Sequence, residues 1–172
     1  VHVHFDGVYM NADVWINGTH LGNHPYGYTA FWYDVTPHVR FGAGNVLAVD
    51  VKNEGVNSRW YSGSGIYRPV WLTIVNPLHI DPWGPYISTP QVFVDSAQVR
   101  VRTEGRNNSG QKTQVTLRTC VVEPNGRIVA ETKSPAGDAL AFDQRMTVER
   151  PSLWSLENPV LYRVSQEVVL AD

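Results

Sequence analysis

Apolar and polar residues alternate with a period of two along most of the chain, rather than clustering at the spacing of an amphipathic helix. Residues 46–51 and 70–75 each place three aliphatic side chains on one face, as half-buried strands do. Residues 12–16 lead into Asn17-Gly18, a pair that tolerates the positive φ angles of a tight hairpin turn, and residues 19–21 follow. The pattern therefore predicts an all-β protein.

A proline-rich stretch interrupts the alternation near the middle of the chain. Prolines at 77, 82, 85 and 90 and a glycine at 84 disfavour a central strand there. We therefore predict a linker at 81–90 between a domain at 1–80 and a domain at 91–172. Strands are predicted in the second domain at 98–103, 114–123, 127–132, 142–149 and 160–170. Roughly seven short strands separated by turns suit an immunoglobulin-like β-sandwich.

Composition and charge limit the classes of protein to which this chain can belong. The 172 residues are 42% hydrophobic and 17% charged, which is ample for a packed core. A formal net charge of −2 gives no electrostatic case for binding nucleic acid or an anionic membrane. No apolar run approaches the roughly 18 residues that a membrane-spanning helix needs. The single cysteine, Cys120, excludes an internal disulfide framework, and we interpret it as an inert thiol.

Several motifs follow one another in an order that is informative. They are Phe5-Asp6-Gly7-Val8, Val14-Trp15-Ile16-Asn17-Gly18, the aromatic run at 27–36, the strand at 44–49, Gly65-Ile66-Tyr67-Arg68, Leu153-Trp154-Ser155 and Pro159-Val160-Leu161-Tyr162. This series resembles the non-catalytic β domains of glycoside hydrolase family 2, the family of β-galactosidases, β-glucuronidases and β-mannosidases. The resemblance implies part of a jelly-roll, galactose-binding-like sandwich, followed by an immunoglobulin-like β-sandwich.

The family resemblance also implies what lies outside this chain. Family members place several jelly-roll strands before the position of Val1 and a catalytic (β/α)₈ barrel after that of Asp172. Retaining hydrolysis needs two carboxylates about 5–5.5 Å apart, and in the family both come from the barrel. We therefore expect no catalytic residue and no cofactor in this chain, and no activity from it alone. The expected partners are that barrel, a terminal β-galactoside or related sugar, and a second copy, since missing strands would leave an apolar face uncovered.

The resemblance points to a few sugar-facing residues. Arg59 stands where some family members carry an acidic residue that reaches the sugar hydroxyls. It could donate hydrogen bonds to hydroxyls, and more readily to a carboxylate, or it could be a surface arginine or part of a domain-interface ion pair. Tyr9 aligns with an asparagine that contacts sugar in some β-galactosidases, and Asn11 has the matching chemistry two residues away. Trp60 and Tyr61 either stack on a pyranose ring or pack in the core.

The sequence also raises further interpretations of individual residues, location and function. His2 and His4 share a strand face, with His20 and His24 as further candidates, but a His-x-His pair without a third ligand at defined spacing does not predict a metal site. Trp154 is expected to close the end of the second sandwich. A periplasmic or secreted location suits a polysaccharide-degrading enzyme, although a cytoplasmic one remains open. The alternative functions are a stand-alone carbohydrate-binding module and a structural β-sandwich array.

Overall fold

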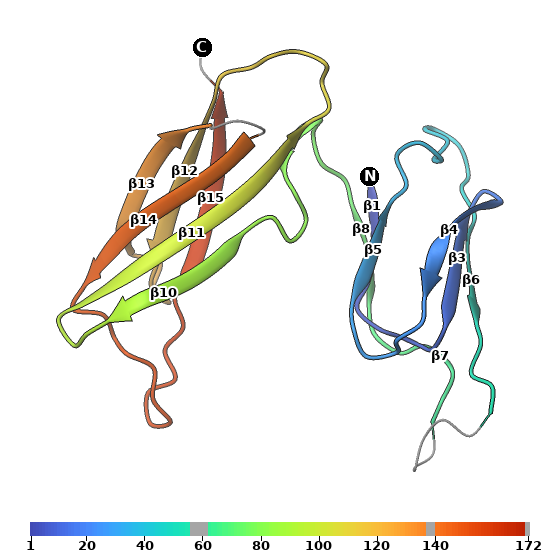
Figure 1. Ribbon diagram of the computed structural model, residues 1–172, viewed down its shortest axis with the longest axis horizontal. Coiled ribbons are helices and arrows are strands. Elements are labelled where there is room, and N and C mark those ends of the chain that lie inside the picture. Colours follow the sequence, from blue (N-terminus) through green and yellow to red (C-terminus); the bar gives the residue numbers. More distant parts are fainter. Residues whose placement is uncertain (56–61, 137–139, 171–172) are drawn as a thin grey trace. The chain divides into compact units, whose positions relative to one another are not determined.

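The computed structural model describes residues 1–55, 62–136 and 140–170 and confirms an all-β chain (Figure 1). It divides into two compact units, Val1–Val75 and Asn76–Asp172. No helix in these described ranges is long and apolar enough to cross a membrane.

The described residues of the first unit form eight strands, in two three-stranded antiparallel sheets and one short ribbon. The strand order is β5-β1-β8 in one sheet, β4-β3-β6 in the other, and β2-β7 in the ribbon. The strands are β1 (His2–Phe5), β2 (Val8–Tyr9), β3 (Ala12–Ile16), β4 (Thr19–His24), β5 (Phe31–Asp34), β6 (Leu47–Val51), β7 (Gly65–Ile66) and β8 (Val70–Thr73).

The predicted hairpin joins β3 and β4. Asn17 and Gly18 both have positive φ angles, of 51° and 87°, and Ile16 pairs with Thr19 across the two-residue turn. Asn17 also holds the next strand, because its Nδ2 donates to the carbonyl of His38 and its Oδ1 accepts from the amide of Val46. The Asn-Gly prediction is therefore confirmed, and the asparagine side chain adds contacts beyond the turn.

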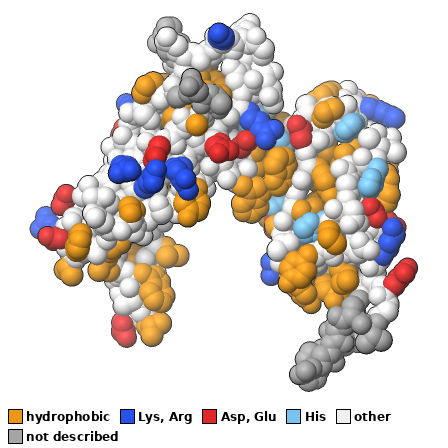
Figure 2. All heavy atoms as spheres, viewed as in Figure 1, with side chains coloured by type: hydrophobic (Ala, Val, Ile, Leu, Met, Phe, Trp, Pro, Cys, Tyr) orange, Lys and Arg blue, Asp and Glu red, His pale blue; other side chains and the backbone are white. Residues whose placement is uncertain are grey.

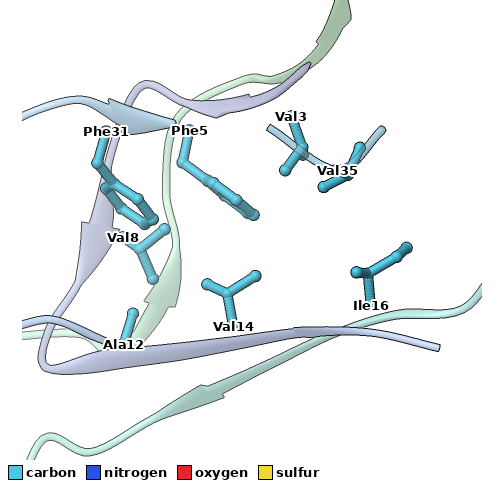
Figure 3. Packing of buried hydrophobic residues seen from close by; sticks show 8 residues of the cluster. All are labelled: Val3, Phe5, Val8, Ala12, Val14, Ile16, Phe31 and Val35. Atoms are coloured by element: carbon cyan, nitrogen blue, oxygen red, sulfur yellow. The ribbon is translucent and has the colours of Figure 1, made fainter. Parts of the chain in front are cut away.

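The core of the first unit lies between its two sheets. Val3 and Phe5 of β1 point toward Val14 and Ile16 of β3 (Figure 3). The rings of Phe5 and Phe31 stack with their centroids 4.9 Å apart. The alternation on β3, together with the inward side chains Val3 and Phe5 of β1, therefore produces the buried layer that the sequence pattern predicted.

This core is open along β6 and β8. Leu72 pairs with Val3 and faces the same side of the sheet, yet it is 65% exposed, whereas Val3 is 3% exposed. Leu47 of β6 and Ile74 join Leu72 around an apolar cavity of about 350 Å³. Figure 2 shows apolar side chains at the surface of the molecule. Association of two copies through this face stays a prediction.

The second unit is the immunoglobulin-like sandwich. Its strands are β9 (Leu78–Ile80), β10 (Tyr86–Val92), β11 (Ser96–Asn107), β12 (Val115–Val122), β13 (Ile128–Pro135), β14 (Ala141–Glu149) and β15 (Arg163–Leu170). One sheet has the order β10-β11-β14, with β9 pairing the far end of β11, and the other has the order β13-β12-β15. Aliphatic side chains of β11 and β14 pack against β12 between the sheets.

A polar network crosses this core. Thr119 of β12 donates a hydrogen bond to Gln144 Oε1 of β14, and Gln144 Nε2 donates to Ser134 Oγ and to a carbonyl of β12. Gln166 of β15 donates to Thr119 and to Thr103 of β11, at 3.0 and 2.8 Å. Gln144 is 3% exposed and Thr119 is fully buried, so these hydrogen bonds tie the two sheets together without solvent.

Two features of the second unit differ from the sequence predictions. The segment expected as a linker at 81–90 contains a turn and most of β10, because Pro90 sits at an irregularity on an edge strand where no ladder hydrogen bond is lost. The last strand begins at Arg163 and not at Val160. Trp154 lines an apolar end cavity of about 480 Å³ but is 57% exposed, so it covers the cavity without filling the core.

Candidate functional site

The candidate site lies in the first unit, where β2 pairs with β7. Tyr9 is directly opposite Gly65, and Val8 is opposite Ile66. Residue 65 ends the segment that follows β6, and this segment includes Arg59, Trp60 and Tyr61. These three predicted sugar contacts lie outside the described residues. The β2–β7 pair nevertheless places Tyr9 beside the end of that segment.

Tyr9 forms the buried floor of the site. Its side chain is 7% exposed, and a Cβ added at Gly27 would lie 2.4 Å from its ring, so only glycine permits this approach. Tyr67 donates a hydrogen bond from its hydroxyl to the Gly27 carbonyl at 2.8 Å. The segment around Gly27 is thus held against the ring of Tyr9, whose predicted role in touching sugar stays a prediction.

Two exposed tyrosines cover this floor, and sequence reasoning did not identify them. The Tyr28 ring meets the Tyr9 ring edge-on, with centroids 5.3 Å apart, and Tyr26 meets Tyr28 in the same way at 5.6 Å. Tyr26 and Tyr28 are 58% and 60% exposed. The sequence signal that could have identified them is Tyr26-Gly27-Tyr28. In such a sequence the glycine lets the backbone approach a neighbouring strand, while the flanking rings face outward.

The surroundings of Tyr28 keep its phenol neutral. Desolvation, followed by a side-chain hydrogen bond with Tyr9, raises the pKa of Tyr28 above its ordinary value. The phenol therefore stays protonated at physiological pH and can both donate and accept a hydrogen bond. An exposed, rigidly held aromatic ring with a neutral hydroxyl is well suited to a pyranose ring and its hydroxyl groups.

Asn11 adds a polar group beside the tyrosines. The backbone N–H of Asn11 donates to the carbonyl of Pro25 at 3.1 Å, which places Asn11 next to Tyr26. Its Oδ1 accepts a hydrogen bond from Asn23 Nδ2, and its φ of 51° is one that asparagine tolerates. Asn11 and Tyr9 are two residues apart along the chain, and a sugar contact by either one stays a prediction.

The carboxylate of Asp13, two residues from Asn11 along the chain, has a hydrogen-bonding partner on each of its oxygens. Lys52 Nζ lies 3.0 Å from its Oδ2, and His20 Nε2 lies 2.9 Å from its Oδ1. These hydrogen bonds, from Lys52 first and then His20, lower the pKa of Asp13. A carboxylate held ionised by a lysine cannot act as a general acid at neutral pH. The site can therefore position a ligand, and its described residues supply no acid and nucleophile pair.

The described residues contain no group of three or more His, Cys, Asp or Glu side chains arranged to hold a metal ion. His24, one of the histidines considered for that role, stacks on Phe31 with ring centroids 4.2 Å apart and is hydrogen-bonded to Thr29. His20 is paired with Asp13 and packs near Trp15. These two histidines therefore have packing and hydrogen-bonding roles.

Comparison with known proteins gives consistent matches along the chain. The model of the glycosyl hydrolases family 2 matches residues 78–172. The β-galactosidase BoGH2A of Bacteroides ovatus is 45% identical over 97% of this chain, which spans 20% of that protein.

Solved structures agree with the sequence matches. A family 2 glycosyl hydrolase from Bacteroides cellulosilyticus has a TM-score of 0.92 and 45% identity over 98% of this chain and 24% of its own. A β-glucuronidase from the same family has a TM-score of 0.92 and 30% identity over 98% of this chain and 20% of its own. The chain thus spans about a fifth of the length of these relatives.

Proposed function

Because the chain belongs to glycoside hydrolase family 2, we propose that it is the non-catalytic N-terminal part of a retaining exo-β-glycosidase whose terminal sugar is bordered by Tyr26, Tyr28 and Asn11. The observation that carries the proposal is the tyrosine pair, which packs on the buried ring of Tyr9 while both of its rings remain more than half exposed. The remaining domains of the enzyme supply the acid and the nucleophile in this proposal.

We propose β-galactosidase as the activity of the whole enzyme. The β-galactosidase of Bacteroides ovatus is 45% identical to this chain, whereas a putative β-glucuronidase of Formosa agariphila is 39% identical and a β-glucuronidase of Bacteroides uniformis with a solved structure is 34% identical. The tyrosines and Asn11 offer neutral hydrogen-bonding groups, which suit a sugar without a charge. Among the described residues of this site, Lys52 is committed to Asp13 and does not provide a free cation for a uronate.

The test is a kinetic comparison in the whole enzyme that carries this chain. We expect Tyr28→Ala to lower kcat/KM for an aryl β-galactoside by about fivefold, because one aromatic contact contributes on the order of 1 kcal/mol. Tyr28→Phe keeps the ring and should recover most of that loss. Phe41→Ala removes another exposed aromatic side chain of the same unit and serves as the control.

Two outcomes would refute the proposal. If Tyr28→Ala and Phe41→Ala gave the same kcat/KM as the unchanged enzyme, the tyrosine pair would not border the sugar. If the unchanged enzyme hydrolysed aryl β-glucuronides faster than aryl β-galactosides, the choice of sugar would be wrong.

The same tyrosine pair supports a second candidate function, weak sugar binding by this chain alone. Titration of the 172-residue chain with galactose should then shift the aromatic NMR signals of Tyr26 and Tyr28. Unchanged signals at tens of millimolar galactose would remove the stand-alone binding module from consideration.

A further inference from the structure

The outer face of the sheet β10-β11-β14 in the second unit carries an ordered grid of polar side chains. The strand register places Tyr86, Arg102 and Asp143 in one row across the three strands. The next row contains Ser88, Arg100 and Arg145. Neighbouring strands lie about 4.8 Å apart and successive residues of one face about 7 Å apart, so the two rows form a flat surface of molecular dimensions.

The three arginines of this grid share a single carboxylate. Arg100 is ion-paired with Asp143, with its Nε 2.8 Å from Oδ1 and a second, shorter contact from Nη2 to Oδ2. Arg102 lies directly opposite Asp143, and Arg145 is two residues along the same strand. Within the described residues neither Arg102 nor Arg145 has a carboxylate within 4 Å. Figure 2 shows blue side chains gathered near a red one over β11 and β14.

The register also brings two like charges together. Arg100 and Arg145 are direct cross-strand partners, an arrangement that is unfavourable without a nearby anion. The hydrogen bond from Arg100, together with the charges of Arg145 and Arg102, lowers the pKa of Asp143. One ionised carboxylate against three guanidinium groups leaves a local excess of positive charge on a chain whose net charge is −2. Glu104 lies in the row next to Arg102 and lines one shallow pocket with Arg102 and Asp143, whereas Glu149 lies at the opposite end of the face, so Arg145 is farther from these carboxylates than Arg102 is.

An aromatic ring lies beside the guanidinium group of Arg102. Arg102 lies over the ring of Tyr86, 4.8 Å from its centroid, and Tyr86 is 59% exposed. This stacking orients the planar group while leaving its N–H edges available for a bidentate contact. Beyond Arg100, the next row adds the amides of Gln91 and Gln98 and the hydroxyl of Thr147.

We propose that this face binds saccharides that carry an anionic group, a carboxylate or a sulfate, with Arg102 and Arg145 holding the anion. A guanidinium fork matches the geometry of both anions. Tyr86 provides a surface for a sugar ring, while the glutamines and Thr147 provide partners for hydroxyl groups. The site lies on the second unit and does not rest on the role proposed for the tyrosines of the first.

The test uses the 172-residue chain and NMR titration with oligosaccharides of equal length. A hexamer of galacturonate and a sulfated galactan hexamer represent the two anions, and a neutral β-galactan hexamer and inorganic sulfate are the comparison ligands. We expect the anionic hexamers to shift amide signals at 86–102 and 143–147, with affinity that falls as salt is raised. The ratio of the two affinities identifies the preferred anion.

Three double variants test the residues, and the two alanine variants have equal charge. Arg102→Ala/Arg145→Ala should lower the affinity for an anionic hexamer by at least about tenfold, because two charge-assisted contacts are lost. Arg40→Ala/Arg163→Ala removes two exposed arginines from elsewhere and should change it less than about twofold. Arg102→Lys/Arg145→Lys keeps the charge but loses the fork, so it should bind more weakly than the unchanged chain. Unaltered urea unfolding midpoints show that each variant is folded.

Several results would overturn the proposal. Equal binding of the neutral and anionic hexamers would remove the role of charge, and equal losses in the two alanine variants would remove the role of this face. Shifts produced by inorganic sulfate as strongly as by the sulfated hexamer would show an anion site without saccharide recognition. An absence of shifts with any hexamer at millimolar concentration would exclude the site.

Discussion

The buried glutamine of the second unit gives a sharp test of what holds its two sheets together. Gln144→Met replaces a side chain that is 3% exposed with an apolar one of similar length. The change removes three hydrogen bonds, one from Thr119, one to Ser134 and one to the carbonyl of Leu117. Leaving buried polar partners unsatisfied costs about 1–3 kcal/mol per group, so we expect the second unit to lose about 2–4 kcal/mol of unfolding free energy.

The assay is urea unfolding of the chain, followed through NMR signals of the second unit so that the two units are measured separately. The matched control is Gln98→Met, which makes the same chemical change at an exposed position of β11 in the same sheet. We expect the control to remain within about 0.5 kcal/mol of the unchanged protein.

A double-mutant cycle separates the network from simple packing. Thr119→Val removes the hydroxyl that Gln144 and Gln166 share. If the hydrogen bonds carry the effect, the double variant Gln144→Met/Thr119→Val should be less destabilised than the sum of the single variants. Strictly additive losses, or a Gln144→Met loss no larger than that of Gln98→Met, would refute the reasoning.

Two further predictions concern the remaining contacts. Because Lys52 and then His20 lower the pKa of Asp13, its ionised form stabilises the folded state above the ordinary carboxyl pKa, and this contribution is lost as pH falls through the lowered value. Lys52→Met should raise that pKa, as measured by carboxyl carbon shifts, and an unchanged titration would contradict the assignment. A Cβ at Gly84 would lie 2.5 Å from the Glu104 carbonyl oxygen and 2.8 Å from that of Asp81, so Gly84→Ala should cost about 1–3 kcal/mol in urea unfolding. Gly44→Ala, with nothing within 4 Å, is the control, and equal midpoints for the two variants would count against the packing argument.

Local sequence signals predicted much of the fold because they act over a few residues. Asn17-Gly18 specifies its turn through backbone conformation alone, and the alternation on β3 and β14 specifies which side chains face inward. The Pro-rich segment was harder to interpret. Proline signals only the loss of a donor, and an edge strand tolerates that loss as readily as a linker does.

The candidate site depends on contacts that are distant in sequence. Nothing local to Tyr9 shows that Gly27 approaches its ring or that the ring is buried. The exposure of Tyr26 and Tyr28 follows from that same approach. Gln144 and Thr119 likewise occupy inward positions that polarity alone assigns to the surface, and only their partners on other strands make burial favourable.

The open side of the first unit affects how that unit responds to heat and denaturant. The heat capacity of unfolding and the urea m-value both scale with the surface newly exposed on unfolding. Leu72, Ile74 and Val46 are already 65%, 73% and 70% exposed in the folded state, so they add little to that change. A unit the size of Val1–Val75 would ordinarily show a heat capacity change of about 1 kcal/mol/K. The first unit should fall below this value and unfold over a broader range of urea than its length implies.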